Sequence, residues 1–348
     1  MSLETHRRPF RTEDVAGIVS LFAETYGRVI TPAHYEWKLR TRLSPVENVA
    51  IAVDGQDRPV FHIAGIPCRC HLGGTERWIM VAVDAMTAPG YRRRGLLTQH
   101  TSELFARWRE AGIALVLGLP NEQWGSRTVA LGWRPLYPLA WLVLPLRPVR
   151  MMAGRLRVPA LGRLAVAGRV WRRRWQKEAG SDLSVEEASA VGTDVDQVSA
   201  RVHSTIPFSI VRDRAWVSWR YLESPEGGYR VLIARRGSHT CGYAAYRIRD
   251  RHRARSATIA EISAAQDPTM YQSLIRATLA RLVEAGVDEV RTLAVPGSFS
   301  HDMFRRAGFF RGRHSFGVEH VALDPAVSRL DLRNPALWHV TGGDFDVA

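Results

Sequence analysis

The segment from Val81 to Trp133 restricts the possible folds of this chain more than any other stretch. Its pattern predicts a strand, a Pro/Gly turn, a basic loop that ends at Gly95, a helix, a buried strand and a second helix. The expected bounds are 81–86 for the first strand, 96–111 for the first helix, 113–119 for the second strand and Gly132 for the end of the second helix. Such alternation predicts an α/β fold.

The helix after the loop has a clear apolar face. Residues that repeat at helical spacing are Leu97, Thr101, Leu104, Phe105, Trp108 and Ala111. Polar side chains such as Gln99 and Glu103 lie away from that face, and Gly112 ends the helix. The sequence therefore predicts a stable helix directly behind the basic loop.

The loop itself has the composition of an anion site. It consists of Arg92, Arg93, Arg94, Gly95, Leu96 and Leu97. Backbone N–H groups at the start of a helix lack partners within the helix and carry the positive end of its dipole. Gly95 allows the backbone to approach a ligand closely, and arginine side chains suit phosphate. We therefore expect a phosphorylated ligand here, with an ordinary solvated turn as the alternative.

Length and composition favour two domains. A chain of 348 residues with 46% hydrophobic residues can bury a full core and is about twice the usual size of one domain. The first ten residues are polar and charged, so we expect no secretion signal and a soluble, cytoplasmic protein. The most apolar run, 136–146, is too short to span a bilayer. Cys68, Cys70 and Cys241 lack the spacing of a zinc site, so we expect no metal.

The formal net charge of +14 would normally suggest nucleic acid or anionic lipid as a partner. However, Lys38 and Lys177 are the only lysines among 48 basic residues, as expected from a GC-rich coding sequence. We therefore expect no nucleic-acid partner. The basic connector 147–180 suits a segment that packs against its own protein, with contact to a membrane surface as the alternative and no stable insertion. The sequence leaves the oligomeric state open.

The second half of the chain repeats the order of the first. Trp37 recurs as Trp219, an offset of 182 residues, and Gly132 recurs as Gly308, an offset of 176. Nearly constant offsets indicate two copies of one α/β unit. The expected ranges are 1–146 for an N-terminal domain, 147–180 for the connector, 181–325 for a C-terminal domain and 326–348 for a tail. Segment 264–268 of the second copy contains neither Gly nor Arg, so we expect only the first copy to bind the phosphorylated ligand.

The strand, loop and helix resemble motif A of the GNAT (general N-acetyltransferase) superfamily, whose loop reads Gln/Arg-x-x-Gly-x-Gly/Ala. Arg92, Gly95 and Leu97 occupy the three pattern positions, and Leu97 departs from the usual Gly or Ala. The approach from Thr87 to Gly95 also fits the superfamily. The matching closure consists of Pro120, Asn121, Leu131, Gly132 and Trp133.

The chain is similar to bacterial tandem-GNAT proteins over nearly its whole length. The residues that carry this likeness in the second half are Arg212, Asp213, Trp219, Arg220, Tyr221, Pro225 and Tyr229, with Trp338, Thr341, Gly343, Asp344 and Asp346 in the tail. The resemblance implies two tandem GNAT-type acyl-CoA N-acyltransferase folds, the second degenerate, each with a mixed, mostly antiparallel sheet flanked by helices. Asp344 and Asp346 are expected either to be solvated or to reach an acceptor amine.

The resemblance also implies acetyl-CoA as co-substrate and an amine of a small molecule or amino sugar as acceptor. The residues expected to hold acetyl-CoA are Val81, Val83, Arg92, Arg93, Arg94, Gly95, Leu96, Leu97 and Asn121. In the superfamily, a backbone N–H of the strand before the loop polarises the thioester, and here that strand is 81–86. Asn121 is expected either to bind the pantetheine arm or to cap the helix that follows.

Acyl transfer needs a group that takes a proton from the amine and a group that protonates the thiolate. Asp84 is the first candidate base, and an ion pair with Arg92 or Arg94 that fixes the loop is the equal alternative. Glu122 is the second candidate base, or else a partner of a helix dipole.

The usual acid of the superfamily is a Tyr, and Thr128 stands at its position here. Tyr137 or a water molecule is the candidate replacement. The loss of this Tyr favours one competing reading, a non-catalytic acyl-CoA-binding or scaffold protein. Another is a Fem-type aminoacyl transferase, but such enzymes take aminoacyl-tRNA and do not need the basic glycine loop.

Overall fold

The computed structural model describes residues 4–120, 127–147, 183–251 and 254–345. The chain divides into two compact units. The first contains Met1–Tyr137 and Gly317–Arg333, and the second contains Pro138–Phe316 and Asn334–Ala348. In each unit helices flank a mixed, mostly antiparallel sheet, which confirms the expected fold class.

The sheet of the first unit has the order β1, β2, β3, β4, β5, β13. All neighbouring strands are antiparallel except β4 and β5, which are parallel. The bounds are Thr5–Arg8 for β1, Val49–Asp54 for β2, Pro59–Leu72 for β3, Thr75–Thr87 for β4, Leu115–Gly118 for β5 and Phe310–Ala322 for β13.

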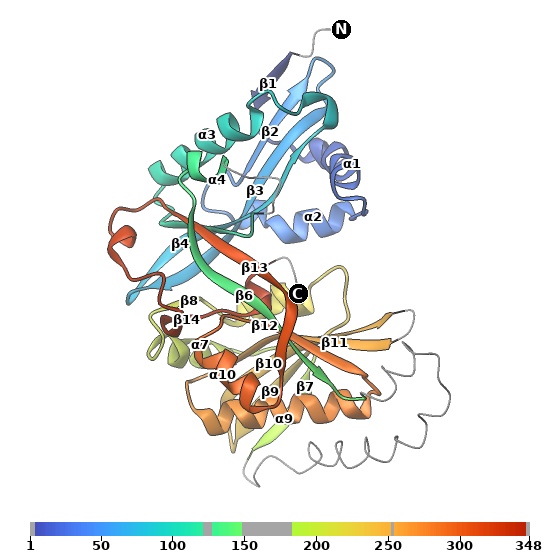
Figure 1. The fold of residues 1–348 in the computed structure, drawn as a ribbon, viewed down its shortest axis with the longest axis vertical. Coiled ribbons are helices and arrows are strands. Elements are labelled where there is room, and N and C mark those ends of the chain that lie inside the picture. The colour runs from blue at the N-terminus through green and yellow to red at the C-terminus, as the bar shows by residue number, and fades with distance from the viewer. Residues whose placement is uncertain (1–3, 121–126, 148–182, 252–253, 346–348) are drawn as a thin grey trace. The chain divides into compact units, whose positions relative to one another are not determined.

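Helices cover both faces of this sheet. Helices α1 (Val15–Tyr26) and α2 (Pro32–Leu39) lie on one face, and α3 (Leu96–Glu110) lies on the other (Figure 1). Helix α3 confirms the predicted helix, and the apolar spacing places Trp108 in the core. A side chain at Gly65 on β3 would meet the Trp108 ring at 2.7 Å, so this glycine allows the close approach. The short helix α4 (Arg127–Ala130) follows β5.

The sheet of the second unit repeats this pattern with the order β7, β9, β10, β11, β12, β6. Its one parallel pair is β11 with β12. The bounds are Ser184–Ala188 for β7, Tyr229–Arg236 for β9, His239–Arg251 for β10, Ala254–Ala264 for β11, Glu289–Ala294 for β12 and Arg134–Pro145 for β6. A short strand β8 (Phe208–Ile210) pairs with β14 (Trp338–His339).

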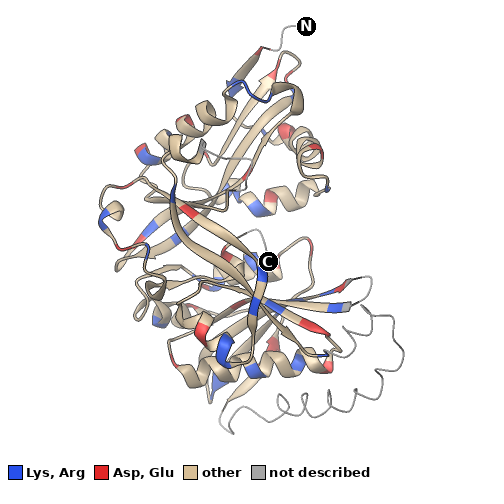
Figure 2. Cartoon of the chain, in the orientation of Figure 1, with Lys and Arg blue, Asp and Glu red and all other residues tan. Residues whose placement is uncertain are grey.

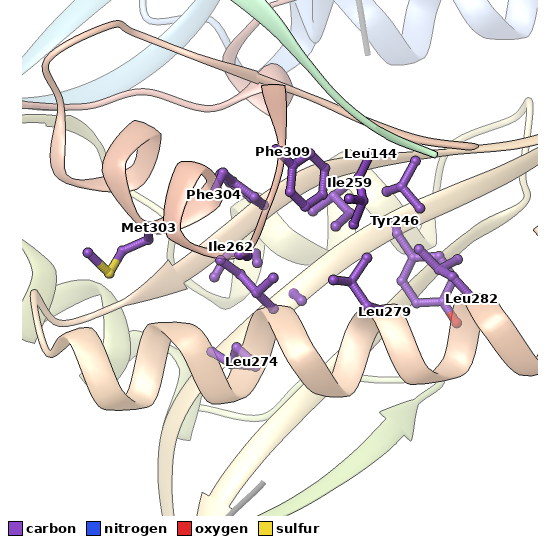
Figure 3. Packing of buried hydrophobic residues seen from close by; sticks show 14 of the residues in the cluster. Leu144, Tyr246, Ile259, Ile262, Leu274, Leu279, Leu282, Met303, Phe304 and Phe309 are labelled. Atoms are coloured by element: carbon purple, nitrogen blue, oxygen red, sulfur yellow. The ribbon is translucent and has the colours of Figure 1, made fainter. Parts of the chain in front are cut away.

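The helices of the second unit are α7 (Asp194–His203), α8 (Arg214–Val217), which continues into a π-helical segment (Ser218–Leu222), α9 (Pro268–Glu284) and α10 (Phe299–Arg306). The core of the unit lies between α9 and the sheet (Figure 3). There Leu274, Leu279 and Leu282 of α9 pack in one cluster with Ile259 and Ile262 of β11. In Figure 2 basic residues are distributed over helices and strands of both units.

The last strand of each sheet comes from the other half of the sequence. Strand β6 follows the helices of the first half, but its residues 140–145 pair with β12 in the second unit. Strand β13 follows the helices of the second half, but its residues 319–322 pair with β5 in the first unit. The units therefore differ from the ranges 1–146 and 181–325 that the sequence suggested. An apolar strand pattern fits either sheet edge, so the local sequence does not distinguish the two pairings.

The tail of the chain is built into the second unit around a buried ion pair. The guanidinium Nη2 of Arg212 lies 2.5 and 2.7 Å from the carboxylate oxygens of Asp344, and Arg212 Nε lies 2.9 Å from Glu261 Oε1. All three side chains are almost fully buried. The expectation that Asp344 is solvated or reaches an acceptor is therefore wrong, because a distant arginine neutralises it inside the unit. Asp346 lies outside the described residues.

The described part of the chain contains no helix that is both long and apolar enough to cross a membrane. The basic connector 147–180 falls outside the described residues except for Arg147.

Replacing Asp344 by Asn should destabilise the second unit strongly, because it leaves the buried Arg212 charge with one carboxylate fewer. Glu261 still pairs with Arg212, so we expect a loss of about 1–3 kcal/mol in the free energy of unfolding, measured by chemical denaturation. Glu187→Gln is the matched control, since Glu187 forms an exposed pair with Arg230 in the same unit and should cost less than about 1 kcal/mol. Equal effects in the two variants would contradict a structural role for Asp344.

Candidate functional site

Strand β4 contains a bulge at the point where the site begins. His62 of β3 faces Met86 of β4, whereas Ala64, two residues further on, faces Val83. Strand β4 therefore carries one residue more than β3 in this interval, which is the geometry of a β-bulge. Asp84 lies in the bulge with φ of 52°, a left-handed conformation that Asp adopts more readily than most residues.

The side chain of Asp84 forms a buried ion pair. Lys38 Nζ of α2 lies 2.6 Å from Asp84 Oδ2, and the two side chains are only 2% and 8% exposed. The Lys38 ammonium also lies 5.5 Å from the centre of the Phe22 ring of α1. The pair thus connects the bulge of β4 to a helix on the face of the sheet, because each buried charge needs the other as its counter-ion.

The backbone of Asp84 is held from the other side by His62. Its Nδ1 lies 2.8 Å from the carbonyl oxygen of Asp84, and its Nε2 lies 2.9 Å from the hydroxyl of Tyr35. A carbonyl only accepts hydrogen bonds, so Nδ1 carries the proton, and Nε2 accepts the hydrogen bond that Tyr35 donates. Burial lowers the pKa of His62, which keeps the imidazole neutral in this position.

Strands β4 and β5 separate immediately before the bulge. Their parallel pairing joins Ile79–Ala82 to Leu115–Gly118 and ends there. Val81 is within this paired stretch, and Val83 is just beyond it. Among the described residues, β4 has no β5 partner after Ala82, and in this sense its backbone is open on that side.

Two residues of the basic loop between β4 and α3 have left-handed backbone conformations. Arg93 has φ of 64° and Gly95 has φ of 82°. Gly95 is the N-cap of α3, and no side chain caps this end of the helix. Within the described residues, the N–H groups of Gly95, Leu96 and Leu97 have no recorded acceptor. Consecutive free N–H groups at a helix start form an anion-binding concavity.

The arginines of this loop are exposed. Arg92 Nε donates to the carbonyl oxygen of Thr87 at 3.0 Å, and the Arg94 guanidinium lies 5.8 Å from the centre of the Tyr91 ring. The sequence suggested Arg92 or Arg94 as an ion-pair partner of Asp84, whereas the structure pairs Asp84 with Lys38. The structure therefore separates the bulge from the loop arginines, although both belong to the β4–α3 connection.

The remaining candidates lie elsewhere. Tyr137 is buried on β6, and Thr128 is in the short helix α4. Asn121 and Glu122 lie outside the described residues. The described residues contain no group of three or more His, Cys, Asp or Glu that could hold a metal ion.

Sequence reasoning missed the three side chains that hold the bulge, which are Lys38, His62 and Tyr35. One signal was available for Lys38, because it is one of two lysines in a chain that otherwise uses arginine. Lysine presents a compact charge on a flexible stem, which the planar guanidinium group of arginine does not reproduce. For His62 and Tyr35 no local pattern indicated their pairing, since they lie 27 residues apart.

The first unit also contains a cavity of about 640 Å³ beside the approach to the loop. It is lined by parts of α1, by the β2–β3 turn and by Ala88–Tyr91. Several carboxylates line it, but Asp14 is paired with Arg8, and Asp54 is paired with Arg58. These pairs cancel much of the negative charge, so we assign no ligand to the cavity.

Comparison with known proteins agrees with this geometry. Residues 6–135 match the family model of the acetyltransferase (GNAT) domain. A comparison with curated protein sequences gave no match. The matched residues end within β6 and contain both the bulge and the basic loop.

Three solved structures share the fold over 93% of this chain. A conserved protein from Enterococcus faecalis V583, described as a probable N-acyltransferase, has a TM-score of 0.67 at 12% identity, with 74% of its own chain covered. GCN5-related N-acetyltransferases from Kribbella flavida and Anabaena variabilis have TM-scores of 0.61 and 0.66, identities of 14% and 11%, and coverages of 73% and 74%. At these identities the likeness establishes the fold.

Residues 6–135 therefore match an acetyltransferase domain of the GNAT type, and the chain shares its fold with the three solved structures.

The buried, neutral state of His62 predicts a loss of stability in mild acid. Its pKa is below the ordinary value of 6.5 in the folded protein, so below that pH the unfolded chain takes up a proton that the folded chain does not. The free energy of unfolding should fall as the pH decreases, by at most about 1.4 kcal/mol per pH unit from this group. Denaturation of His62→Gln should show a smaller fall between pH 7 and 5 than the wild type. An unchanged slope would mean that His62 does not contribute. Burial also lowers the pKa of His320 and His339, so part of the fall should remain.

Proposed function

We propose that this protein is an acetyl-CoA-dependent N-acyltransferase that transfers an acetyl group to the amine of a small molecule or amino sugar. The observation that carries the proposal is the uncapped start of α3 behind the loop Arg92–Leu97, next to the bulge of β4. An anion cradle and a diverging strand pair lie in sequence order within one GNAT domain. These are the two features that a CoA thioester needs, one for its pyrophosphate and one for its acyl end.

In this proposal the N–H groups of Gly95, Leu96 and Leu97 bind the pyrophosphate, and the side chains of Arg92–Arg94 add positive charge around it. The open backbone of β4 near Val81 and Val83 supplies the N–H that polarises the thioester carbonyl. Asn121 remains a proposed contact to the pantetheine arm. Catalysis then depends mainly on orientation and on stabilisation of the oxyanion.

The proton steps need fewer groups than the sequence suggested. The amine loses a proton as it attacks, and the thiolate gains one as it leaves. The Asp84 carboxylate already has Lys38 as its partner, which argues against a free base at this position. Glu122 and a water molecule remain candidates for the base, and Tyr137 or a water molecule for the acid.

The second unit is proposed not to bind acetyl-CoA, because the start of its matching helix is occupied. The Asp267 carboxylate accepts hydrogen bonds from the N–H groups of Thr269 and Met270 at 2.8 and 3.2 Å. A phosphate there would have to displace this cap and approach a negative charge. The same helix end that is open in the first unit is therefore closed in the second.

Calorimetric titration with acetyl-CoA tests the cofactor site. The wild type should bind one equivalent per chain, and Gly95→Asp should weaken binding at least about tenfold, since it puts a negative charge in the cradle. Gly55→Asp adds the same charge in the β2–β3 turn, where the glycine has no neighbour within 4 Å, and should bind like the wild type. Absence of wild-type binding, or equal binding by Gly95→Asp, would overturn the site.

A second candidate function is non-catalytic binding of an acyl-CoA. Thr128 at the usual Tyr position favours it, because a threonine hydroxyl is a poorer proton donor than a phenol. The two functions share the cofactor site and differ only in turnover.

Amine-dependent release of free CoA thiol separates the two. With a panel of small amines and amino sugars, an active enzyme should release thiol faster than without amine, and Gly95→Asp should lose this activity at non-saturating acetyl-CoA. Acetyl-CoA binding without amine-dependent release from any member of the panel would favour the non-catalytic protein.

A further inference from the structure

The carboxylate of Asp84 forms an ion pair with a buried lysine inside the first unit. It is 2.6 Å from the Lys38 ammonium, and Lys38 as a whole residue is 1% exposed. The groups packed around this pair are Phe22 of α1, Tyr35 of α2 and His62 of β3. The Asp84 carboxylate is therefore the counter-ion of a buried ammonium group, and each side chain fixes the position of the other.

We propose that Lys38 is a positioning residue for the acyl transfer, because its ion pair with Asp84 fixes the bulge of β4 beside the open backbone that would polarise the thioester. The proposal rests on the proposed function. Asp84 is then the anchored residue of the bulge and not the proton acceptor. Three attachments hold the segment, since Lys38 binds the carboxylate, His62 binds the carbonyl oxygen and β3 pairs on either side.

The second unit supports this assignment independently. Strand β11 contains the same irregularity, because Ala245 faces Glu261 and Tyr246 faces Ile259, which leaves Ala260 as the extra residue. Glu261 beside this bulge is 1% exposed and accepts a hydrogen bond from Tyr221 at 2.5 Å.

Tyr221 belongs to the π-helical segment Ser218–Leu222. In the order of elements this segment has the position in the second unit that α2 has in the first. In both units a side chain from the helical segment that precedes the second strand of the sheet contacts a carboxylate at the bulge, and in the second unit Arg212 also pairs with that carboxylate. The second unit has a capped helix in place of the cradle. The contact to the carboxylate at the bulge is present even in the unit whose helix start is capped. Its role there is to fix the strand, which favours the same role for Lys38 and Asp84.

A double-mutant cycle with Lys38→Met, Asp84→Asn and the double variant tests the proposal. Each single variant should lower kcat at least about tenfold while the Kd for acetyl-CoA stays within about threefold, because the loop is separate from the pair. The double variant removes both charges, so it should recover kcat to well above the lower of the two single variants. If the double variant is no better than Asp84→Asn, Asp84 is the base and the proposal fails.

Stability measurements on the same four proteins do not depend on the reaction. The denaturation midpoint should fall in each single variant, and the double variant should lose less than the sum of the two shifts. Additive shifts would overturn the anchoring role. Glu76→Gln is the matched control. Glu76 of β4 pairs with Arg69 of β3 at an exposed position, so its loss should shift the midpoint little.

A spectroscopic test uses the unaltered chain. Since Lys38 and Lys177 are the only lysines, nitrogen-15 lysine labelling gives two side-chain resonances at most. A buried, paired Lys38 ammonium should give one slowly exchanging signal that disappears in Asp84→Asn. If neither ammonium is protected in the wild type, the ion pair is not formed and the proposal is wrong. If the wild type shows the protected signal but does not bind acetyl-CoA, the proposed function is refuted and the ion pair is not.

Discussion

The contact between the Lys38 ammonium and the Asp84 carboxylate ties together the parts of the first unit on which the site depends. It joins α2 to β4 at the one place where β4 departs from regular pairing. A bulged strand in a sheet twists and bends, and here it does so where β4 loses its neighbour β5. Without a fixed bulge, the open backbone of β4 would have no defined direction relative to the loop that follows it.

The two units match in fold and differ at the start of one helix. Their strand orders and parallel pairs match, and both have a long helix after the bulged strand. The difference lies at the start of that helix, where Gly95 leaves the N–H groups free and Asp267 binds them internally. A carboxylate from the chain occupies in the second unit the position that an anion would occupy in the first.

The sequence predicted the features that depend on neighbouring residues. Helical spacing gave α3, and the turn and apolar pattern gave β4 and β5. Features that depend on distant partners were not predictable in this way. From the sequence, nearby arginines were one expected partner of Asp84, but its actual partner, Lys38 on α2, lies 46 residues earlier in the chain. Asp344 looked like part of a solvated end because its partner Arg212 is 132 residues away.

The same distinction explains why the net charge of +14 says little about the function. Many basic side chains are neutralised where they lie, as Arg8 is by Asp14 and Asp57 and Arg212 is by Asp344 and Glu261. In Figure 2 acidic residues lie among the basic ones along the ribbon of both units. The loop arginines are exposed, and Arg92 Nε donates to a carbonyl oxygen. Positive charge gathered beside the N–H groups at the start of a helix attracts an anion more than the same charge spread over the surface does.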